Sequence, residues 1–314
     1  MFPPVIAERL KGEDPAKVEE MDLGCSEIRD EDLVALTPLI QLKRLYLNAT
    51  KVGDAGLVHL KALTKLENLA LNGTQVSDAG LENLKTLTQL KVLYLYGKKV
   101  GDAGLACLKH LTKLEDLDLR NTKVGDAGLV HLEPLTQLRT LNLNGTQVTD
   151  AGLAHLKLLT KLRWLDLTDT KVGDTGLEHL RPLMRLEALC LDGTKVSILG
   201  KELRGRDHAK VIELNLNSPG IRDEDLVALK RMTQLKALHL DNTKVSDAGL
   251  VHIEPLTNLE QINLTGTQIT DAGLEHLKPL TMLRWLLLDD TKVTKAGVDA
   301  FQKHLPECKI VWSP

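Results

Sequence analysis

Hydrophobic residues recur along this chain at a fixed spacing. Each repeat contains two aliphatic residues separated by one other residue, and successive pairs begin 24 residues apart, except for one step of 25 between Leu189 and Leu214. A fixed period of this length predicts a solenoid, in which stacked units share one continuous hydrophobic core. The first residues of the pairs are Met21, Leu45, Leu69, Leu93, Leu117, Leu141, Leu165, Leu189, Leu214, Leu238, Ile262, Leu286 and Ile310.

The pattern within one repeat predicts a strand followed by a helix. Leu45 and Leu47 alternate with polar positions, which is the periodicity of a strand. Leu57, Leu60 and Leu63 then recur at spacings of three, which indicates the apolar stripe of a helix. Neighbouring helices need about 8–10 Å between axes and neighbouring strands about 4.8 Å, so the stack must curve. The predicted fold is α/β: a right-handed αβ solenoid, or horseshoe, with a parallel sheet on the concave face and helices on the convex face.

Two polar residues recur with the same period and are expected to be structural. Asp54 precedes the helix that begins Ala55-Gly56, where a carboxylate can accept hydrogen bonds from the first helical turn. Thr50 follows the strand, where its hydroxyl can bond to nearby backbone groups. The residues equivalent to Asp54 are Asp30, Asp78, Asp102, Asp126, Asp150, Asp174, Asp223, Asp247 and Asp271.

The motif LxxLxLxxTxVxDxGLxxLxxLTx resembles the leucine-rich-repeat superfamily over roughly residues 17–314. It is most similar to the ribonuclease-inhibitor-like and cysteine-containing class, with Thr where that class has Cys or Asn. The 24-residue unit is similar to bacterial, planctomycete-type repeat arrays. The resemblance implies a non-enzymatic protein-interaction scaffold whose inner strand face is the contact surface. Some relatives are ubiquitin-ligase subunits or secreted effectors, so a substrate-receptor subunit, or a spacer array whose active domain lies elsewhere, stays an alternative.

Internal duplication suggests two arrays within the solenoid. Residues 28–36 and 221–229 are identical, and the offset of 193 residues is eight periods plus one. One interpretation is a continuous array with a local irregularity, and the other is two arrays with a flexible joint at 195–212. We predict a cap at 1–20, a first array at 21–205, a second array continuous with it at 206–297 and a cap at 298–314.

Composition limits the cellular compartment and the classes of partner that we expect for this chain. The net charge is -3, and no apolar run approaches the ~20 residues that span a bilayer. The four cysteines lie about 80 residues apart, too far for pairing within a solenoid, and free thiols favour a reducing compartment. No secretory signal is visible. We therefore expect a cytoplasmic monomer that contacts neither membrane nor nucleic acid, although secretion is not excluded.

Aromatic residues concentrate beside the paired aliphatic residues, at positions that face away from the core. All three tyrosines and two of the three tryptophans fall there, in a chain that is 3% aromatic. Tyr and Trp carry much of the energy of protein recognition, although strands favour aromatic residues for structural reasons as well. The predicted partner-binding residues are Tyr46, Asn72, Tyr94, Tyr96, Asp118, Arg120, Trp164, Asp166, His239 and Trp285.

The charge of this face predicts a basic or polar protein or peptide partner. Nine acidic residues oppose only Arg44 and Arg120 there, and a phosphate backbone would be repelled. Six histidines share one helix position, but successive helices are too far apart for zinc ligation. No cofactor, metal or catalytic residue is predicted. The acidic residues are Asp116, Asp118, Asp166, Asp169, Asp192, Glu213, Asp241, Asp289 and Asp290, and the histidines are His59, His131, His155, His179, His252 and His276.

Overall fold

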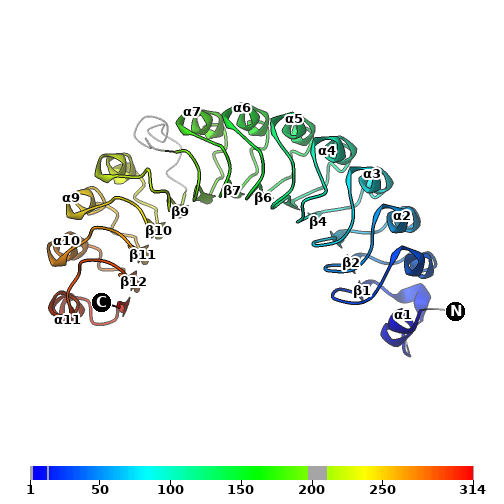
Figure 1. Cartoon of the computed structure of the whole chain (residues 1–314), viewed down its shortest axis with the longest axis horizontal. Helices are drawn as coiled ribbons and strands as arrows, with labels where there is room; N and C mark the ends of the chain where they lie inside the picture. The colour runs from blue at the N-terminus through cyan, green and yellow to red at the C-terminus, as the bar shows by residue number, and fades with distance from the viewer. Residues whose placement is uncertain (1–2, 13, 197–210, 314) are drawn as a thin grey trace. The chain divides into compact units, whose positions relative to one another are not determined.

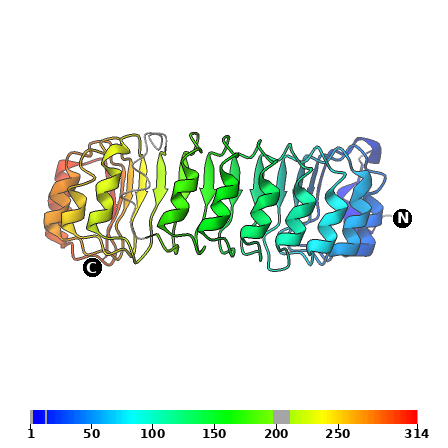
Figure 2. The same cartoon turned by 90° about the horizontal axis from the view of Figure 1, so that it is seen from above.

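The computed structural model describes residues 3–12, 14–196 and 211–313, which form two compact units, Met1–Leu162 and Arg163–Pro314. In each unit a strand alternates with a helical segment, so that strands line the inner side of an arc and helices line the outer side (Figure 1). Seen from above, the strands within a unit run side by side beneath their helices (Figure 2). Among the described residues, no helix is long and apolar enough to cross a membrane.

In the first unit the strands are short and the helices are part α, part 3-10. The strands are β1 (Glu20–Asp22), β2 (Arg44–Tyr46), β3 (Asn68–Ala70), β4 (Val92–Tyr94), β5 (Asp116–Asp118) and β6 (Thr140–Asn142). The helical segments are α1 (Pro4–Arg9), η1 (Pro15–Lys17), η2 (Asp30–Leu36), α2 (Asp54–Leu57), η3 (Val58–Ala62), α3 (Asp78–Leu81), η4 (Glu82–Leu84), α4 (Asp102–Leu108), α5 (Asp126–Leu129), η5 (Val130–Leu132), α6 (Asp150–Leu153) and η6 (Ala154–Leu156).

The second unit repeats this arrangement. Its strands are β7 (Trp164–Asp166), β8 (Ala188–Cys190), β9 (Glu213–Asn215), β10 (Ala237–His239), β11 (Gln261–Asn263), β12 (Trp285–Leu287) and β13 (Lys309–Val311). Its described helical segments are α7 (Asp174–Leu177), η7 (Glu178–Leu180), η9 (Asp223–Arg231), α9 (Asp247–Leu250), α10 (Asp271–Leu277) and α11 (Lys295–His304).

The predicted α/β solenoid fold is confirmed. Within each unit the strands pair in parallel and in chain order, and the aliphatic residue at the centre of each strand meets its equivalent, as Leu45 meets Leu69. β8 and β9 pair across the longer step, with Leu189 opposite Leu214. These central residues are buried, since Leu45 is 0% and Leu69 1% exposed. The predicted array boundary at 205/206, and most of the proposed joint at 195–212, lie outside the described residues.

The recurring aspartate does not cap its own helix as the sequence analysis predicted. Asp54 is the first residue of α2, and the N-cap residue Gly53 makes no side-chain cap. Instead, the Asp54 carboxylate accepts the backbone N–H of Ser77, the N-cap residue of the next repeat, at 2.7 Å. Its second oxygen accepts the Ser77 hydroxyl at 2.6 Å. The aspartate therefore links two repeats, and we call this contact the inter-repeat carboxylate bond.

The same bond recurs along both units. Asp78 accepts the N–H of Gly101 at 2.7 Å, Asp126 that of Thr149 at 2.8 Å, and Asp247 that of Thr270 at 2.8 Å. In most repeats a glycine stands two residues after the aspartate, and a side chain on that glycine would collide with the aspartate of the preceding repeat. A Cβ atom at Gly128, for example, would lie 2.5 Å from Oδ1 of Asp102. The Asp-x-Gly motif is thus a contact between successive repeats.

The recurring threonine is structural, as predicted. Thr50 donates its hydroxyl to the carbonyl of Leu47 at 2.7 Å, and Thr122 donates to Leu119 at 2.7 Å. Both are nearly buried, with exposures of 4% and 3%. This bond closes the turn that leads from each strand to the following helix, within the repeat itself.

Both ends of the described chain are covered by helices. Ile6 of α1 is 0% exposed, and Phe301 of α11 is 1% exposed. The amide of Gln302 donates to the carbonyls of Leu305, Pro306 and Cys308, which holds the turn into β13.

Replacing Asp126 by alanine is expected to lower the free energy of unfolding by about 1–3 kcal/mol. The substitution leaves the Thr149 N–H without its acceptor and removes the 2.6 Å bond from the Thr149 hydroxyl. Asp126→Asn keeps one acceptor oxygen and should lose less than half as much. Urea unfolding followed by circular dichroism measures both, and equal losses for the two variants would contradict the assigned bond.

A double-mutant cycle tests the close approach of Gly128 to Asp102. Gly128→Ala alone should destabilise the protein by about 1–3 kcal/mol, because its Cβ would lie 2.5 Å from Asp102 Oδ1. In an Asp102→Ala background the same substitution should cost clearly less, since the blocking oxygen is gone. Additive effects on the urea midpoint would show that the two residues do not interact.

Candidate functional site

The strand face of the first unit carries a compact aromatic and polar group on β2 to β5. The register places Ala70 between Tyr46 on one side and Tyr94 on the other. Ala70 is only 2% exposed although it lies on the strand face. The two tyrosines, both half-buried, therefore cover it and form a continuous surface across three strands.

Tyr94 is fixed by a hydrogen bond from the next strand. Its hydroxyl donates to Oδ2 of Asp116 at 3.0 Å. Burial and the charge of Asp116 raise the pKa of Tyr94 to about 12. Burial, and to a lesser extent the charge of Asp118, also raises the pKa of the Asp116 carboxyl above its usual value. The pair thus holds a partly desolvated carboxylate beside an aromatic ring.

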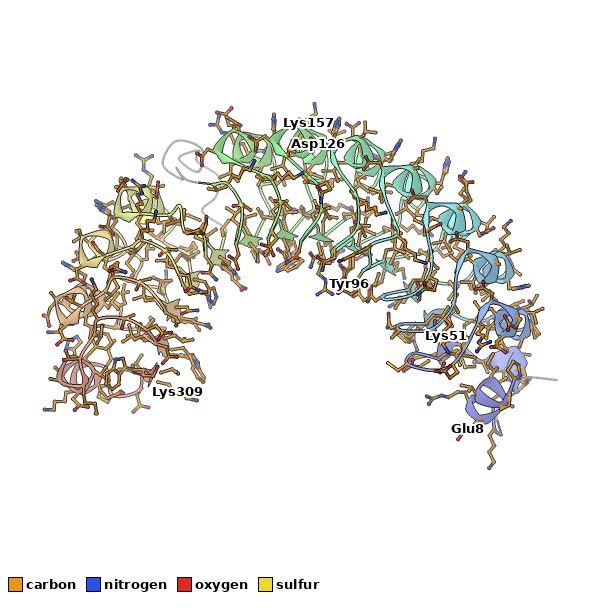
Figure 3. The ribbon with its side chains drawn as sticks, viewed as in Figure 1. Glu8, Lys51, Tyr96, Asp126, Lys157 and Lys309 are labelled. Carbon is orange, nitrogen blue, oxygen red and sulfur yellow. The ribbon has the colours of Figure 1, made fainter. Side chains whose placement is uncertain are left out.

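Tyr96 is the exposed member of the group. It is 42% exposed, and its backbone N–H donates to Asn72 Oδ1 at 2.9 Å. The Arg120 guanidinium lies 5.7 Å from the centre of its ring, close enough for a cation–π interaction. Arg120 also bonds to Asp118, with Nη2 2.7 Å from Oδ2. The ring faces the hollow of the unit's arc (Figure 3).

Several predicted binding residues also hold the backbone, which the sequence analysis missed. Asp118 accepts the N–H of Arg120 at 3.0 Å, and Asp166 accepts that of Thr168 at 2.9 Å. Asn72 Oδ1 accepts the backbone N–H of Tyr96, because Tyr94 has no side-chain acceptor in the position that Asp118 and Asp166 occupy in their repeats. Asp118 and Asp166 are 7% and 8% exposed, so they order the strand ends more than they present a surface.

The candidates of the second unit lie on strands that are not neighbours. Trp164 on β7 is half-buried and pairs in register with Ala188, which is 7% exposed. His239 on β10 is half-buried between strands that carry asparagines in register. Trp285 on β12 is 43% exposed, and the ammonium of Lys309 lies 4.5 Å from its ring centre. The structure therefore does not bring the two tryptophans together within the unit.

The balance of charge on the strand face differs between the units. In the first unit both cations are matched, since Arg44 bonds to Glu20 at 2.6 Å and Arg120 to Asp118. In the second unit Asp192 has a raised pKa, caused first by burial and then by the charges of Asp241 and Asp169. The acidic side chains on the strand face of the second unit therefore repel one another.

The strand face carries two further charged residues that the sequence analysis missed, Glu20 in the first unit and Lys309 in the second. The same periodicity would have identified both.

The histidines do not form a metal site among the described residues, which hold no group of three metal-ligating side chains. His155 and His276 each bond through Nδ1 to a glutamate of the preceding repeat, Glu133 and Glu254, at 2.7 Å. His252 is the exception, with a buried Nδ1 that has no partner and a pKa lowered by burial. His155 and His276 therefore contribute to the stacking of successive repeats.

Comparison with known proteins supports the fold. A family model described as leucine-rich repeat matches residues 110–132, 135–156, 159–180 and 256–278. No curated protein matches the chain. An internalin of Listeria monocytogenes is similar in structure, with a TM-score of 0.74 and 22% identity over 98% of this chain and 93% of the internalin.

Two further solved structures are similar over most of this chain. A leucine-rich-repeat protein of Leptospira interrogans has a TM-score of 0.54 and 19% identity, covering 99% of both chains. The plant peptide hormone receptor RGFR1, solved in complex with RGF2, has a TM-score of 0.60 and 15% identity over 95% of this chain and 50% of the receptor. At these identities the similarity establishes the fold. Proteins of this kind are typically interaction scaffolds and are generally not enzymes. The stacked strand–helix repeats, the matched segments and the similar structures show that the chain has the fold of a leucine-rich-repeat solenoid.

Proposed function

We propose that the chain is a non-enzymatic scaffold that binds a protein or peptide on its strand face, with the tyrosine group of β2 to β5 as the principal contact. The observation that carries the proposal is Tyr96. A large ring is left 42% exposed on the inner face, while its backbone and its flank are held by Asn72 and Arg120. A rigid exposed aromatic side chain buries area on binding at little cost in entropy.

The hydrogen bonds around the group support a preformed surface. Tyr94 is held by Asp116, and Arg120 by Asp118, so neither side chain has to be ordered when a partner arrives. The positive end of Arg120 is already neutralised, so this surface favours aromatic and aliphatic partner residues over charged ones.

The second unit favours a basic segment of the partner. Burial, and then the charge of Asp241, raises the pKa of Asp192, and Glu213 is exposed on the intervening strand. A Lys or Arg side chain placed there would relieve the repulsion and lower the pKa of Asp192. Affinity should then fall as pH drops through that raised pKa, because protonation removes the attracting charge.

The remaining assignments follow from the same features. Every recurrent polar residue serves the repeat, and the described cysteines are free thiols, of which Cys107 and Cys308 are buried with pKa values raised to about 11. We therefore infer a protein without catalytic activity that acts as a cytoplasmic monomer and binds neither nucleic acid nor membrane. A spacer array would show no dependence of any interaction on the tyrosine group.

The tyrosine group is tested with a partner identified by photo-crosslinking from p-benzoylphenylalanine placed at position 96. Tyr94→Ala with Tyr96→Ala should weaken binding of that partner by about 30-fold or more, as expected for a hot spot. Isothermal calorimetry measures the affinity. Tyr96→Ala alone removes only a half-exposed ring and should also weaken binding, with the thermal midpoint nearly unchanged.

The matched control is Val130→Ala, which shortens a 40% exposed side chain on the helical side of the same unit. It should leave the affinity unchanged. If the Tyr96→Ala and Val130→Ala proteins bind the partner as tightly as the native chain, the strand face of the first unit is not the contact surface.

Neutralising the acidic residues should reduce both affinity and its dependence on salt. Asp192→Asn with Asp241→Asn is expected to weaken binding of the same partner by about 10-fold at low ionic strength, with a smaller loss at high salt. Glu224→Gln with Glu275→Gln changes the net charge equally on the helical side and should have little effect. Equal losses in both variants would indicate a general charge effect and contradict a basic contact at this face.

A further inference from the structure

The turn after β4 differs from most of the other turns. Nine turns place a threonine whose hydroxyl bonds to the carbonyl three residues before it. Lys98 occupies that position after β4 and is exposed. The carbonyl of Leu95 thus loses the side-chain bond that closes the equivalent turns.

The backbone of this turn departs from the pattern as well. Gly97 has φ +149°, whereas Gly73 and Asn121, at the same position in the adjacent repeats, have +68° and +54°. Gln75 and Lys123 donate their backbone N–H to the preceding repeat at 2.7 Å. Within the described residues, Lys99 makes no such backbone bond. The turn is therefore attached to its neighbours by fewer bonds than its equivalents.

A small cavity lies under the turn. Its volume is about 10 Å³, and Leu71, Thr74, Leu95 and Val100 are among its lining residues. This volume holds about one water molecule. Fewer bonds and a void beneath allow the turn to adjust its conformation more readily than its neighbours.

The turns of this region are basic. Residues 48–53, 72–77, 96–101 and 120–125 contain five basic residues (Lys51, Lys98, Lys99, Arg120 and Lys123) and no acidic one. The equivalent turns 168–173, 192–197, 241–246 and 289–294 of the second unit contain five acidic and four basic residues. The positive charge is therefore a property of these particular turns and does not follow from the repeat.

The basic side chains lie on the turn that carries the exposed ring and on the next turn. Lys98 and Lys99 follow Tyr96 after Gly97, and Lys123 occupies the position of Lys99 in the next repeat, where a Cβ atom at Gly101 would lie 3.7 Å from the Lys123 Cβ. Lys98, Lys99 and Lys123 are all exposed. Of the five cations, Lys51 is paired with Glu27 and Arg120 with Asp118, and Lys99 donates to the uncharged Gln75. The edge thus combines an accessible aromatic face with excess positive charge.

We propose that the turns after β4 and β5 bind an acidic, extended peptide segment, whose carboxylates contact Lys98, Lys99 and Lys123 and whose apolar side chain packs on Tyr96. Alternate side chains of an extended peptide lie about 6.6 Å apart on one face, a spacing that lysines on successive repeats can reach. Asp116 and Asp118 at the adjoining strands disfavour a continuous phosphate backbone. Binding of this peptide at the turns does not require a partner on the strand face.

The test uses the full chain and three fluorescein-labelled octapeptides, which alternate leucine with glutamate, glutamine or lysine. In fluorescence anisotropy at low ionic strength, the glutamate peptide should bind at least 10-fold more tightly than the other two. Lys98→Glu with Lys123→Glu should reduce its affinity to that of the glutamine peptide. The control Lys61→Glu with Lys157→Glu makes the same charge change on exposed residues, Lys61 in η3 and Lys157 on the helical side (Figure 3), and should keep most of the affinity.

Three results would overturn the proposal. The first is equal binding of the glutamate and glutamine peptides, and the second is an equal loss in the turn variant and the control variant. The third is tighter binding of a labelled single-stranded oligonucleotide than of the glutamate peptide, which would assign the edge to nucleic acid.

A second variant separates the altered turn from its charge. Lys98→Thr restores the hydroxyl bond seen in the nine threonine turns, so the thermal midpoint should rise by about 2–4 °C. Lys98→Gln removes the charge without restoring the bond and should not raise it. Both should weaken glutamate-peptide binding, Lys98→Thr the more strongly. Unchanged peptide affinity in both variants would exclude Lys98 from the contact.

Discussion

The inter-repeat carboxylate bond is the interaction on which the rest of the structure depends. One carboxylate holds the first backbone N–H of the next helical segment and, where the N-cap residue is Ser or Thr, its hydroxyl as well, as Asp54 does with Ser77. The glycine it touches cannot carry a side chain, as Gly104 shows with a Cβ position 2.5 Å from Asp78. Helical segments this short are not stable alone, so their position is set by the preceding repeat. The strands are then held in register and present their side chains on a rigid face.

The sequence predicts the strands and helices well, but it predicts the contacts between successive repeats poorly. Period and alternation place each strand around the first aliphatic residue of its pair, because that residue has to enter the core, although the second residue, such as Leu47, lies just beyond the strand. The role predicted for Asp54 was wrong. A carboxylate that precedes an apolar helical stripe is expected, from sequence alone, to cap the helix that it precedes. Its acceptor role toward Ser77, 23 residues later, depends on how closely helices stack. That distance follows from the small Ala-Gly pair and cannot be read from the spacing of leucines.

The candidate site shows the same division. Position alone identified Tyr94 and Tyr96 as strand-face residues, but the bond from Tyr94 to Asp116 joins residues of different repeats that are not in register. The covering of Ala70 depends on two tyrosines two strands apart. Exposure on a sheet face is decided by the neighbouring side chains on either side, so it is a property of several repeats together. A single-repeat pattern therefore overestimated Asp118 as a contact residue.

An array of this kind restricts where specificity can arise. Aspartate, glycine and threonine recur because each one bonds to the chain itself, and changing any of them weakens the stack. Specificity for a partner can arise only at positions whose side chains make no contact between repeats, or at a position where the recurring structural residue is replaced by another. The repeat of β4 does both, since it carries Tyr96 on a free position and Lys98 where threonine was available. The loss of a turn-closing bond beside an exposed aromatic ring is unfavourable for folding alone, and a binding role gives it a physical reason.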